Sequence, residues 1–183
     1  MEVAISQGIL KCISTDSIRQ IMRTYVSDPA LHRSSYSGDG DPIKMWMECS
    51  EVLQESIDGL VDDAIKRGTS LILEGVHVIP SQKIIRKWTD SGGVATGCVL
   101  TITDPTAHKE VLARRGEMTR KGAEQQMKAF ARIRFIQEEM IRLAKLNNWI
   151  IIEQKLEIDP IDQITASLIS SSNDISQQWP KIE

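Results

Sequence analysis

The chain has 183 residues, of which 26% are charged, and its net charge is only −3. This length suits one ordinary domain, and the small negative charge argues against a dedicated nucleic-acid-binding protein, whose affinity would come from neutralising phosphates. No apolar run approaches the ~20 residues that span a bilayer, the N-terminus lacks the features of a signal peptide, and three widely spaced cysteines suit a reducing compartment, so we expect a cytoplasmic protein without a membrane segment.

The first predicted unit is a short strand that runs directly into a helix. Residues 3–8 have the pattern of the last turns of a helix that ends at a glycine. The compact apolar run over 10–13 then predicts a buried strand. Asp16 or Ser17 is the expected N-cap of the next helix, because such side chains satisfy free amides at a helix start. In an open α/β sheet, this junction of strand end and helix N-terminus is where anionic ligands bind.

The remaining predicted elements alternate between helix and buried strand. A glycine- and aspartate-rich loop over 31–42 leads to a long amphipathic helix over 43–67, which Gly68 ends. Glu74 lies inside the apolar strand predicted over 71–80, where a carboxylate is costly unless it is paired or bound to a cation. The later predictions are a helix over 84–88, a strand over 94–102, a helix over 123–146, a strand over 149–154, a helix over 159–169 and a flexible tail over 170–183.

Alternating helices and all-apolar strands predict a parallel sheet that helices cover on both faces, the three-layer α/β class. Three carboxylates, Asp16, Glu74 and Asp104, lie at the ends of predicted strands or inside them. Residues 108–134, which follow the third strand, contain eight Lys or Arg and three Glu. Acids that can hold a divalent cation would thus face arginines that can hold phosphates, a pairing that phosphoryl transfer needs.

Each of these residues also has a purely structural interpretation. Asp16 can be only a helix cap, and Arg19 and Arg23, one turn apart, can be only an exposed helix face. Three arginines of the basic segment can be solvent-facing helix residues that pair at helical spacing with three glutamates of the same segment. The arginines are Arg114, Arg115 and Arg120, and the glutamates are Glu110, Glu117 and Glu124. The three histidines lie far apart without the spacing of metal ligands, and the sequence has neither a G-x-S-x-G elbow nor a C-x-x-C pair.

Five stretches together resemble the 2-phosphoglycerate kinase family, which includes the plant low-phytic-acid proteins. They are ISTDSIRQIMR (13–23), LHRSSY (31–36), LILEGVHVIP (71–80), HKEVLARRGEMTR (108–120) and FARIRFIQ (130–137), and they occur in family order. The resemblance implies a P-loop kinase domain over 1–169, with ATP and Mg²⁺ as cofactors. It also implies phosphoryl transfer to a small phosphorylated metabolite or an inositol phosphate.

The resemblance further implies roles for individual residues. Asp16 would be the acid on the acceptor side, Glu74 would orient the metal ion or its water, and both are candidate metal ligands. The arginines that would close as a lid over the transferring phosphate are Arg114, Arg115 and Arg120. The residues that would bind the acceptor are Thr15, Arg19, Arg23, His32 and Tyr36. The residues that would contact the cofactor are Arg132 and Arg134.

The sequence departs from this family at its start. The family begins with a strand and a G-x-x-x-x-G-K-[ST] loop that cradles the β- and γ-phosphates, and this sequence has neither. The expected strand order is 2-3-1-4-5 with the first strand and the P-loop absent. The strands at 71–79 and 94–102 would then close up, leave a slot, or accept a complementing strand or a second copy. We therefore expect poor ATP binding and no activity from this chain alone.

Two other interpretations stay open at this point. The chain can be a non-catalytic module, derived from the kinase fold, that keeps a ligand-binding or protein-binding surface. It can also be a plain structural α/β domain, which would predict that Asp16, Glu74 and Arg19 do not converge.

Overall fold

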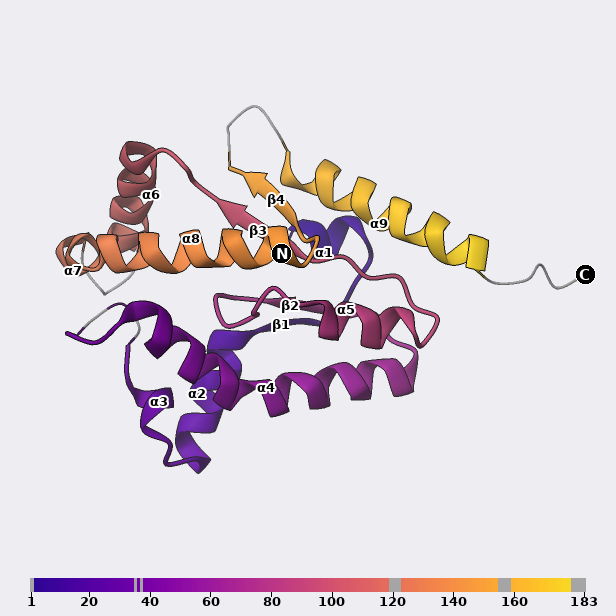
Figure 1. Ribbon diagram of the computed structural model, residues 1–183, viewed down its shortest axis with the longest axis horizontal. Helices are drawn as coiled ribbons and strands as arrows, with labels where there is room; N and C mark the ends of the chain where they lie inside the picture. The colour runs from indigo at the N-terminus through magenta and orange to yellow at the C-terminus, as the bar shows by residue number, and fades with distance from the viewer. Residues whose placement is uncertain (1, 35, 37, 119–122, 155–158, 179–183) are drawn as a thin grey trace, which may run out of the picture.

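The structure, a computed structural model, describes residues 2–34, 36, 38–118, 123–154 and 159–178. Short strands alternate with helices along the chain (Figure 1). The strands are β1 (Cys12–Ser14), β2 (Ile72–Glu74), β3 (Cys98–Thr101) and β4 (Ile150–Glu153). The helices are α1 (Glu2–Ser6), α2 (Thr15–Tyr25), α3 (Pro29–His32), α4 (Pro42–Arg67), α5 (Gln82–Thr89), α6 (Pro105–Met118), α7 (Ala123–Lys128), α8 (Phe130–Leu146) and α9 (Pro160–Gln178). Within these described ranges, no helix is both long and apolar enough to cross a membrane.

The strands form two separate parallel pairs. β1 pairs with β2, with Ser14 opposite Glu74, and β3 pairs with β4, with Thr101 opposite Glu153. The α/β class is thus confirmed. Among the alternatives for the two middle strands, closing up is wrong for the described residues, because β2 and β3 do not pair and two sheets of two strands form. Each pair joins strands that the order 2-3-1-4-5 places side by side. The order across the two sheets stays a prediction.

The strands are shorter than their apolar runs because the chain turns early. The run over 71–80 is a strand only to Glu74, since Gly75 takes a φ of 124° and the Val78 amide donates back to the Gly75 carbonyl over 3.2 Å. A positive φ of this size is open mainly to glycine. The strand predicted over 94–102 is confined to β3. An apolar composition predicts burial, and the glycine decides where the extended backbone ends.

The helix termini follow from side chains that satisfy free backbone groups. The Asp41 carboxylate accepts hydrogen bonds from the amides of Ile43 and Lys44 at the start of α4, and Gly68 ends this helix in the left-handed conformation, as expected. The N-cap prediction for α2 is wrong. The Ser14 hydroxyl, at the last residue of β1, accepts from the Asp16 amide over 3.3 Å, so the helix begins at Thr15.

The later helices differ from the predicted ranges. The helix predicted over 123–146 is divided at Ala129 into α7 and α8. The last helix was predicted to end at 169, but α9 continues to Gln178, so residues 170–178 are helical.

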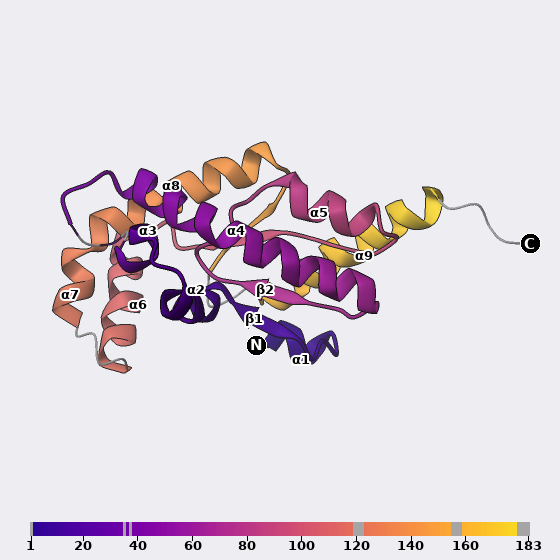
Figure 2. The ribbon, with the colours of Figure 1, turned by 90° about the horizontal axis from the view of Figure 1, so that it is seen from below.

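Helices cover the strand pairs on two sides. Figure 2 shows α4, α5 and α8 along one side of the strands and α1 and α9 along the other. The main buried cluster joins α2, α3 and α4 through Ile18, Leu31, Cys49, Leu53 and Ile57. The helices α2, α3, α6 and α7 gather at the end of the molecule where β1 and β2 finish (Figure 2).

Candidate functional site

The carboxyl ends of β1 and β2 carry two exposed acids. Glu74 is the last residue of β2 and lies opposite Ser14 of β1, while Asp16 is in the first turn of α2, two residues further on. Asp16 and Glu74 therefore lie at the same edge of this sheet, which is the edge where ligands bind in parallel α/β folds. The structure brings these two predicted residues together, as the sequence pattern required.

Thr15 fills the space beside Gly75 between these acids. Its side chain is fully buried, and its hydroxyl has no hydrogen-bond partner among the described residues. A Cβ atom on Gly75 would lie 2.1 Å from the Thr15 Oγ1 atom. The first residue of α2 thus packs directly on the backbone that follows β2, and the site depends on a glycine there.

A group on α4 holds the turn that follows Glu74 from the opposite side. The Trp46 indole N–H donates to the Val76 carbonyl over 2.7 Å. The His77 ring lies with Nδ1 3.1 Å from the Ser50 hydroxyl and with Nε2 3.9 Å from the Cys49 thiol. Sequence reasoning treated His77 only as one of three scattered histidines and missed this group. The available signal was the spacing of 46, 49 and 50, which puts three side chains on one helical face.

Tyr36 links the acceptor-side residues to α6 through electrostatics. The pKa of its hydroxyl is raised to about 12, first by burial and then by the negative charge of Asp16, while the positive charges of Arg115 and Arg19 oppose the shift. The charges of Asp16 and Arg19 on α2 and of Arg115 on α6 therefore all act on this one hydroxyl. Of the predicted acceptor residues, His32 is exposed at the end of α3.

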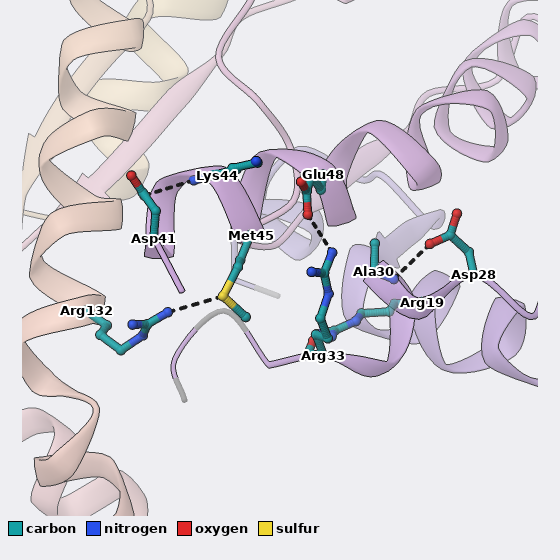
Figure 3. A network of polar contacts seen from close by, with 9 residues as sticks. All are labelled: Arg19, Asp28, Ala30, Arg33, Asp41, Lys44, Met45, Glu48 and Arg132. Atoms are coloured by element: carbon teal, nitrogen blue, oxygen red, sulfur yellow. Dashed lines mark hydrogen bonds and ion pairs between the residues drawn. The ribbon is translucent and has the colours of Figure 1, made fainter. Parts of the chain in front are cut away.

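Arg19 and Arg23 hold α3 against α2. The Nε atoms of both side chains donate to the Leu31 carbonyl, over 2.9 and 2.7 Å, and an Arg19 Nη2 group donates to the Arg33 carbonyl. Arg33 in turn pairs with Glu48 of α4 over 2.5 Å, and Figure 3 shows this chain of contacts from α2 to α4. The predicted role of both arginines in binding the phosphoryl acceptor stays a prediction. Only the N–H groups that do not bond to these carbonyls can serve it.

Replacing Arg19 by lysine is expected to lower the free energy of unfolding by about 1 kcal/mol, because lysine keeps the charge but cannot reach two carbonyls with one planar fork. Urea denaturation measures this change. The matched control is Arg142→Lys on α8, which weakens only an exposed pair with Glu139 and should change stability by less than about 0.5 kcal/mol. Equal losses of unfolding free energy in the two variants would show that the contacts of Arg19 with the Leu31 and Arg33 carbonyls do not stabilise the fold.

The predicted lid and cofactor arginines divide into two groups. Arg114 and Arg115 are exposed on α6, while Arg120 lies outside the described residues. Arg132 contacts the Met45 sulfur of α4 over 3.4 Å (Figure 3). Arg134 donates to the Ile102 carbonyl over 2.7 Å, so it contacts the backbone just after β3. The cofactor contacts of Arg132 and Arg134 remain predictions.

The remaining predicted features have structural partners. Asp104 caps α6 by accepting from the Thr106 amide over 2.9 Å. Glu124 pairs with Lys128 over 2.8 Å within α7, so its observed partner is a lysine and not one of the arginines that the helical-spacing alternative named. His108 packs edge-on against Phe130, and burial together with Arg134 lowers its pKa. These residues support the fold on the side of α6 to α8.

The donor set at the sheet edge can be tested against Mg²⁺. No group of three or more His, Cys, Asp or Glu side chains is arranged to hold a metal ion in the part of the chain that the structure describes. Mg²⁺, however, is commonly bound by one or two carboxylates together with waters and substrate phosphates. Two carboxylates at one edge are enough donors for a Mg²⁺ ion that a phosphorylated substrate would also hold, and they are too few for a resident metal bound by protein alone.

Comparison with curated proteins finds relatives along most of the chain. It is 30% identical over 173 residues to the 2-phosphoglycerate kinase of Methanocaldococcus jannaschii, covering 88% of this chain and 55% of the relative. It is 31% identical over 184 residues to that of Methanopyrus kandleri (93% and 55%) and 29% identical over 187 residues to that of Methanothermobacter thermautotrophicus (93% and 60%). The chain thus spans a little more than half the length of these relatives.

No family model matches the chain, and no solved structure gives a significant match. The relationship therefore depends on the aligned sequences, which run through both strand pairs and the helices between them. On these alignments, the chain is similar to archaeal 2-phosphoglycerate kinases over most of its own length.

Proposed function

We propose that this chain carries the acceptor side of a kinase that transfers a phosphoryl group to a small phosphorylated metabolite. The observation that carries the proposal is the placement of Asp16 and Glu74 at one sheet edge, and it is supported by the charges of Asp16, Arg19 and Arg115, which all act on the Tyr36 hydroxyl. The relatives named above are 2-phosphoglycerate kinases, so 2-phosphoglycerate is the acceptor that we favour over an inositol phosphate. These relatives give no support to the link with plant low-phytic-acid proteins.

Each side chain has a role in this proposal. Asp16 accepts the proton of the attacking hydroxyl, and Glu74 orients a Mg²⁺ ion or one of its waters. Arg114, Arg115 and Arg120 close over the transferring phosphate and neutralise its charge, which is the main task in phosphoryl transfer. Thr15, His32 and Tyr36 shape the acceptor pocket. When bound, ATP supplies the phosphoryl group and Mg²⁺ neutralises its phosphates.

The nucleotide side is the part that these 183 residues lack. The sequence contains no G-x-x-x-x-G-K-[ST] loop, whose amides and lysine hold the β- and γ-phosphates. The proposal therefore includes weak ATP binding by this chain alone, with a complementing strand or a second copy between β2 and β3 as the route to a complete sheet. Amide hydrogen exchange along β2 and β3 would slow on addition of such a partner.

Isothermal titration of the 183-residue chain tests both sides separately. We expect 2-phosphoglycerate to bind and Arg115→Ala to weaken this binding about tenfold, the usual effect of losing one charge-assisted contact. The matched control, Arg142→Ala, removes an exposed arginine of α8 that pairs with Glu139 and should leave binding unchanged.

The Kd for Mg·ATP should lie above the low micromolar range. A lower Kd would show that this chain binds the nucleotide without the G-x-x-x-x-G-K-[ST] loop, which would overturn that part of the proposal. Absence of 2-phosphoglycerate binding, or an equal effect of both arginine variants, would overturn the acceptor site.

The alternative function is a non-catalytic module that keeps the acceptor pocket or a protein-binding surface. A glycine-rich lysine loop in the coding region upstream of Met1 would favour the kinase, and its absence would favour the module. The specific observation on the side of the module is that Arg19 and Arg23 use their Nε groups within the fold.

A further inference from the structure

The turn over 75–78 is held between two helices, although it carries no regular structure of its own. On one side, the α4 residue Trp46 donates to the Val76 carbonyl over 2.7 Å, and His77 reaches Ser50 and Cys49 of the same helix. His77 is only 2% exposed, and the three α4 side chains are fully buried. A histidine buried so completely must find a partner for each ring nitrogen or lose stability.

The contacts of His77 define which of its nitrogens carries the proton. The Ser50 hydroxyl has one hydrogen, and it donates that hydrogen to the Trp46 carbonyl over 2.8 Å. The same oxygen lies 3.1 Å from His77 Nδ1, so a Ser50 hydroxyl that donates to Trp46 is left as an acceptor there, and Nδ1 then carries the hydrogen. Nε2 is then the acceptor, and the thiol of Cys49 faces it at 3.9 Å. The neutral Nδ1–H tautomer satisfies both nitrogens.

The surroundings of the ring keep it neutral. An imidazolium would place a second N–H against a thiol, which is a weak acceptor. Burial lowers the pKa of His77 to about 4, with the charges of Arg19 and Arg23 acting in the same direction and that of Asp16 opposing them. Burial also raises the pKa of Cys49, so its thiol stays protonated and able to donate.

The first residue of the turn lies against the candidate site. Gly75, two residues before His77, has no room for a Cβ atom because Thr15 Oγ1 occupies that space. Glu74 precedes Gly75 directly and lies opposite Ser14, which precedes Thr15. If the turn shifted away from α4, Gly75 would change its position relative to Thr15. Glu74, which is bonded to Gly75, would move as well.

We propose that His77 is a positioning residue, which locks the 75–78 turn onto α4 through its Nδ1–H group and thereby fixes Glu74 and Thr15 at the sheet edge. The use of that edge rests on the proposed function, but the lock itself does not. The role of His77 does not depend on sequence similarity, because it follows from hydrogen bonds within the fold.

Two variants separate the hydrogen bond from the volume of the ring. In His77→Asn, the amide nitrogen can stand where Nδ1 stands and donate to Ser50, whereas His77→Leu keeps an apolar side chain but has no donor. Native-state hydrogen exchange reads the turn amides at 76–78 and the α2 amides at 15–17. We expect His77→Leu to speed exchange at least tenfold in both segments and His77→Asn to stay within about threefold of the wild type.

The matched control is Ile152→Val, a fully buried position of β4 in the other strand pair. It loses stability without touching the turn, and it should leave the ratio of exchange between 15–17 and the rest of α2 unchanged. If Ile152→Val changed this ratio as much as His77→Leu does, the effect of His77→Leu would come from general destabilisation of the fold. That result would overturn the proposed role of His77.

The tautomer gives a second and independent readout. Long-range ¹H–¹⁵N correlation spectra at pH 7 should show the Nδ1–H form of His77, and the Nε2–H form would overturn the proposal. Unchanged exchange at 15–17 in His77→Leu would do so as well. None of these measurements uses activity. Failure of 2-phosphoglycerate binding with an intact lock would therefore count against the proposed function alone.

Discussion

Replacing Gly75 by alanine is expected to destabilise the fold by about 2 to 6 kcal/mol. Gly75 has a φ of 124°, a conformation that costs an L-residue of order 1–3 kcal/mol. The new methyl group would also lie 2.1 Å from Thr15 Oγ1, and such overpacking typically costs about 1–3 kcal/mol more. Because a small domain has only about 5–15 kcal/mol in total, the variant should be partly unfolded at 37 °C. Thermal and urea denaturation measure the loss.

A double-mutant cycle with Thr15→Ala separates the two costs. Removing the Thr15 hydroxyl relieves the overlap but leaves the backbone conformation strained, so the double variant should recover about 1–3 kcal/mol relative to the sum of the single changes. The control is Gly59→Ala in α4, where a Cβ atom meets nothing within 4 Å and alanine should stabilise by about 1 kcal/mol. Additive losses for Gly75 and Thr15 would show that the contact is not the cause.

Lowering the pH from 7 to 4 is expected to remove about 3 kcal/mol of stability through His77. Its pKa is about 4 in the folded chain and 6.5 in the reference state, so the unfolded chain binds more protons throughout this window. Stability therefore rises with pH between 4 and 6.5 and is constant above that range. Each pKa unit of difference corresponds to about 1.4 kcal/mol.

Urea denaturation at several pH values measures this slope, and His77→Asn should flatten it. His108, whose pKa is also lowered, contributes with the same sign and accounts for the slope that remains. Asp58, Asp63 and Glu139 have lowered pKa values, so their stabilising contributions are lost only at more acidic pH, as it falls below their ordinary values. A wild-type slope that persists unchanged in His77→Asn would contradict the assignment to His77.

Much of the architecture could be predicted because periodicity and capping residues act locally. The α4 helix ends at Arg67 before Gly68, as its apolar spacing and the glycine indicated. Glu74 and Asp16 were expected at one sheet edge, and strand pairing places them there. The lengths of the strands could not be predicted in the same way. The apolar run over 71–80 does not reveal that Gly75 turns the backbone beside Thr15, a contact between segments 60 residues apart in the sequence.

The arginines of α2 show why single-residue roles are harder to predict. Their spacing correctly placed Arg19 and Arg23 on one face, and that face meets the Leu31 carbonyl at the end of α3. A carbonyl acceptor leaves no trace in the side-chain pattern, because every residue carries one. The same holds for Trp46 and Val76, where the indole finds a backbone group that composition cannot identify.

The division into two strand pairs has a consequence for how the chain is made. Both strands of the first pair lie within residues 12–74, and both strands of the second lie within 98–153, so among the residues that the structure describes no strand ladder joins the early part of the polypeptide to the late part. During synthesis from the N-terminus, the α2–α4 core and its ladder are complete before β3 leaves the ribosome. The nascent first half can therefore acquire its tertiary contacts early, and the second half then docks onto it through helix pairs such as α4 with α8 and α1 with α9, and through contacts of Asn147 and Trp149 with the carbonyls of Pro80 and Ser81.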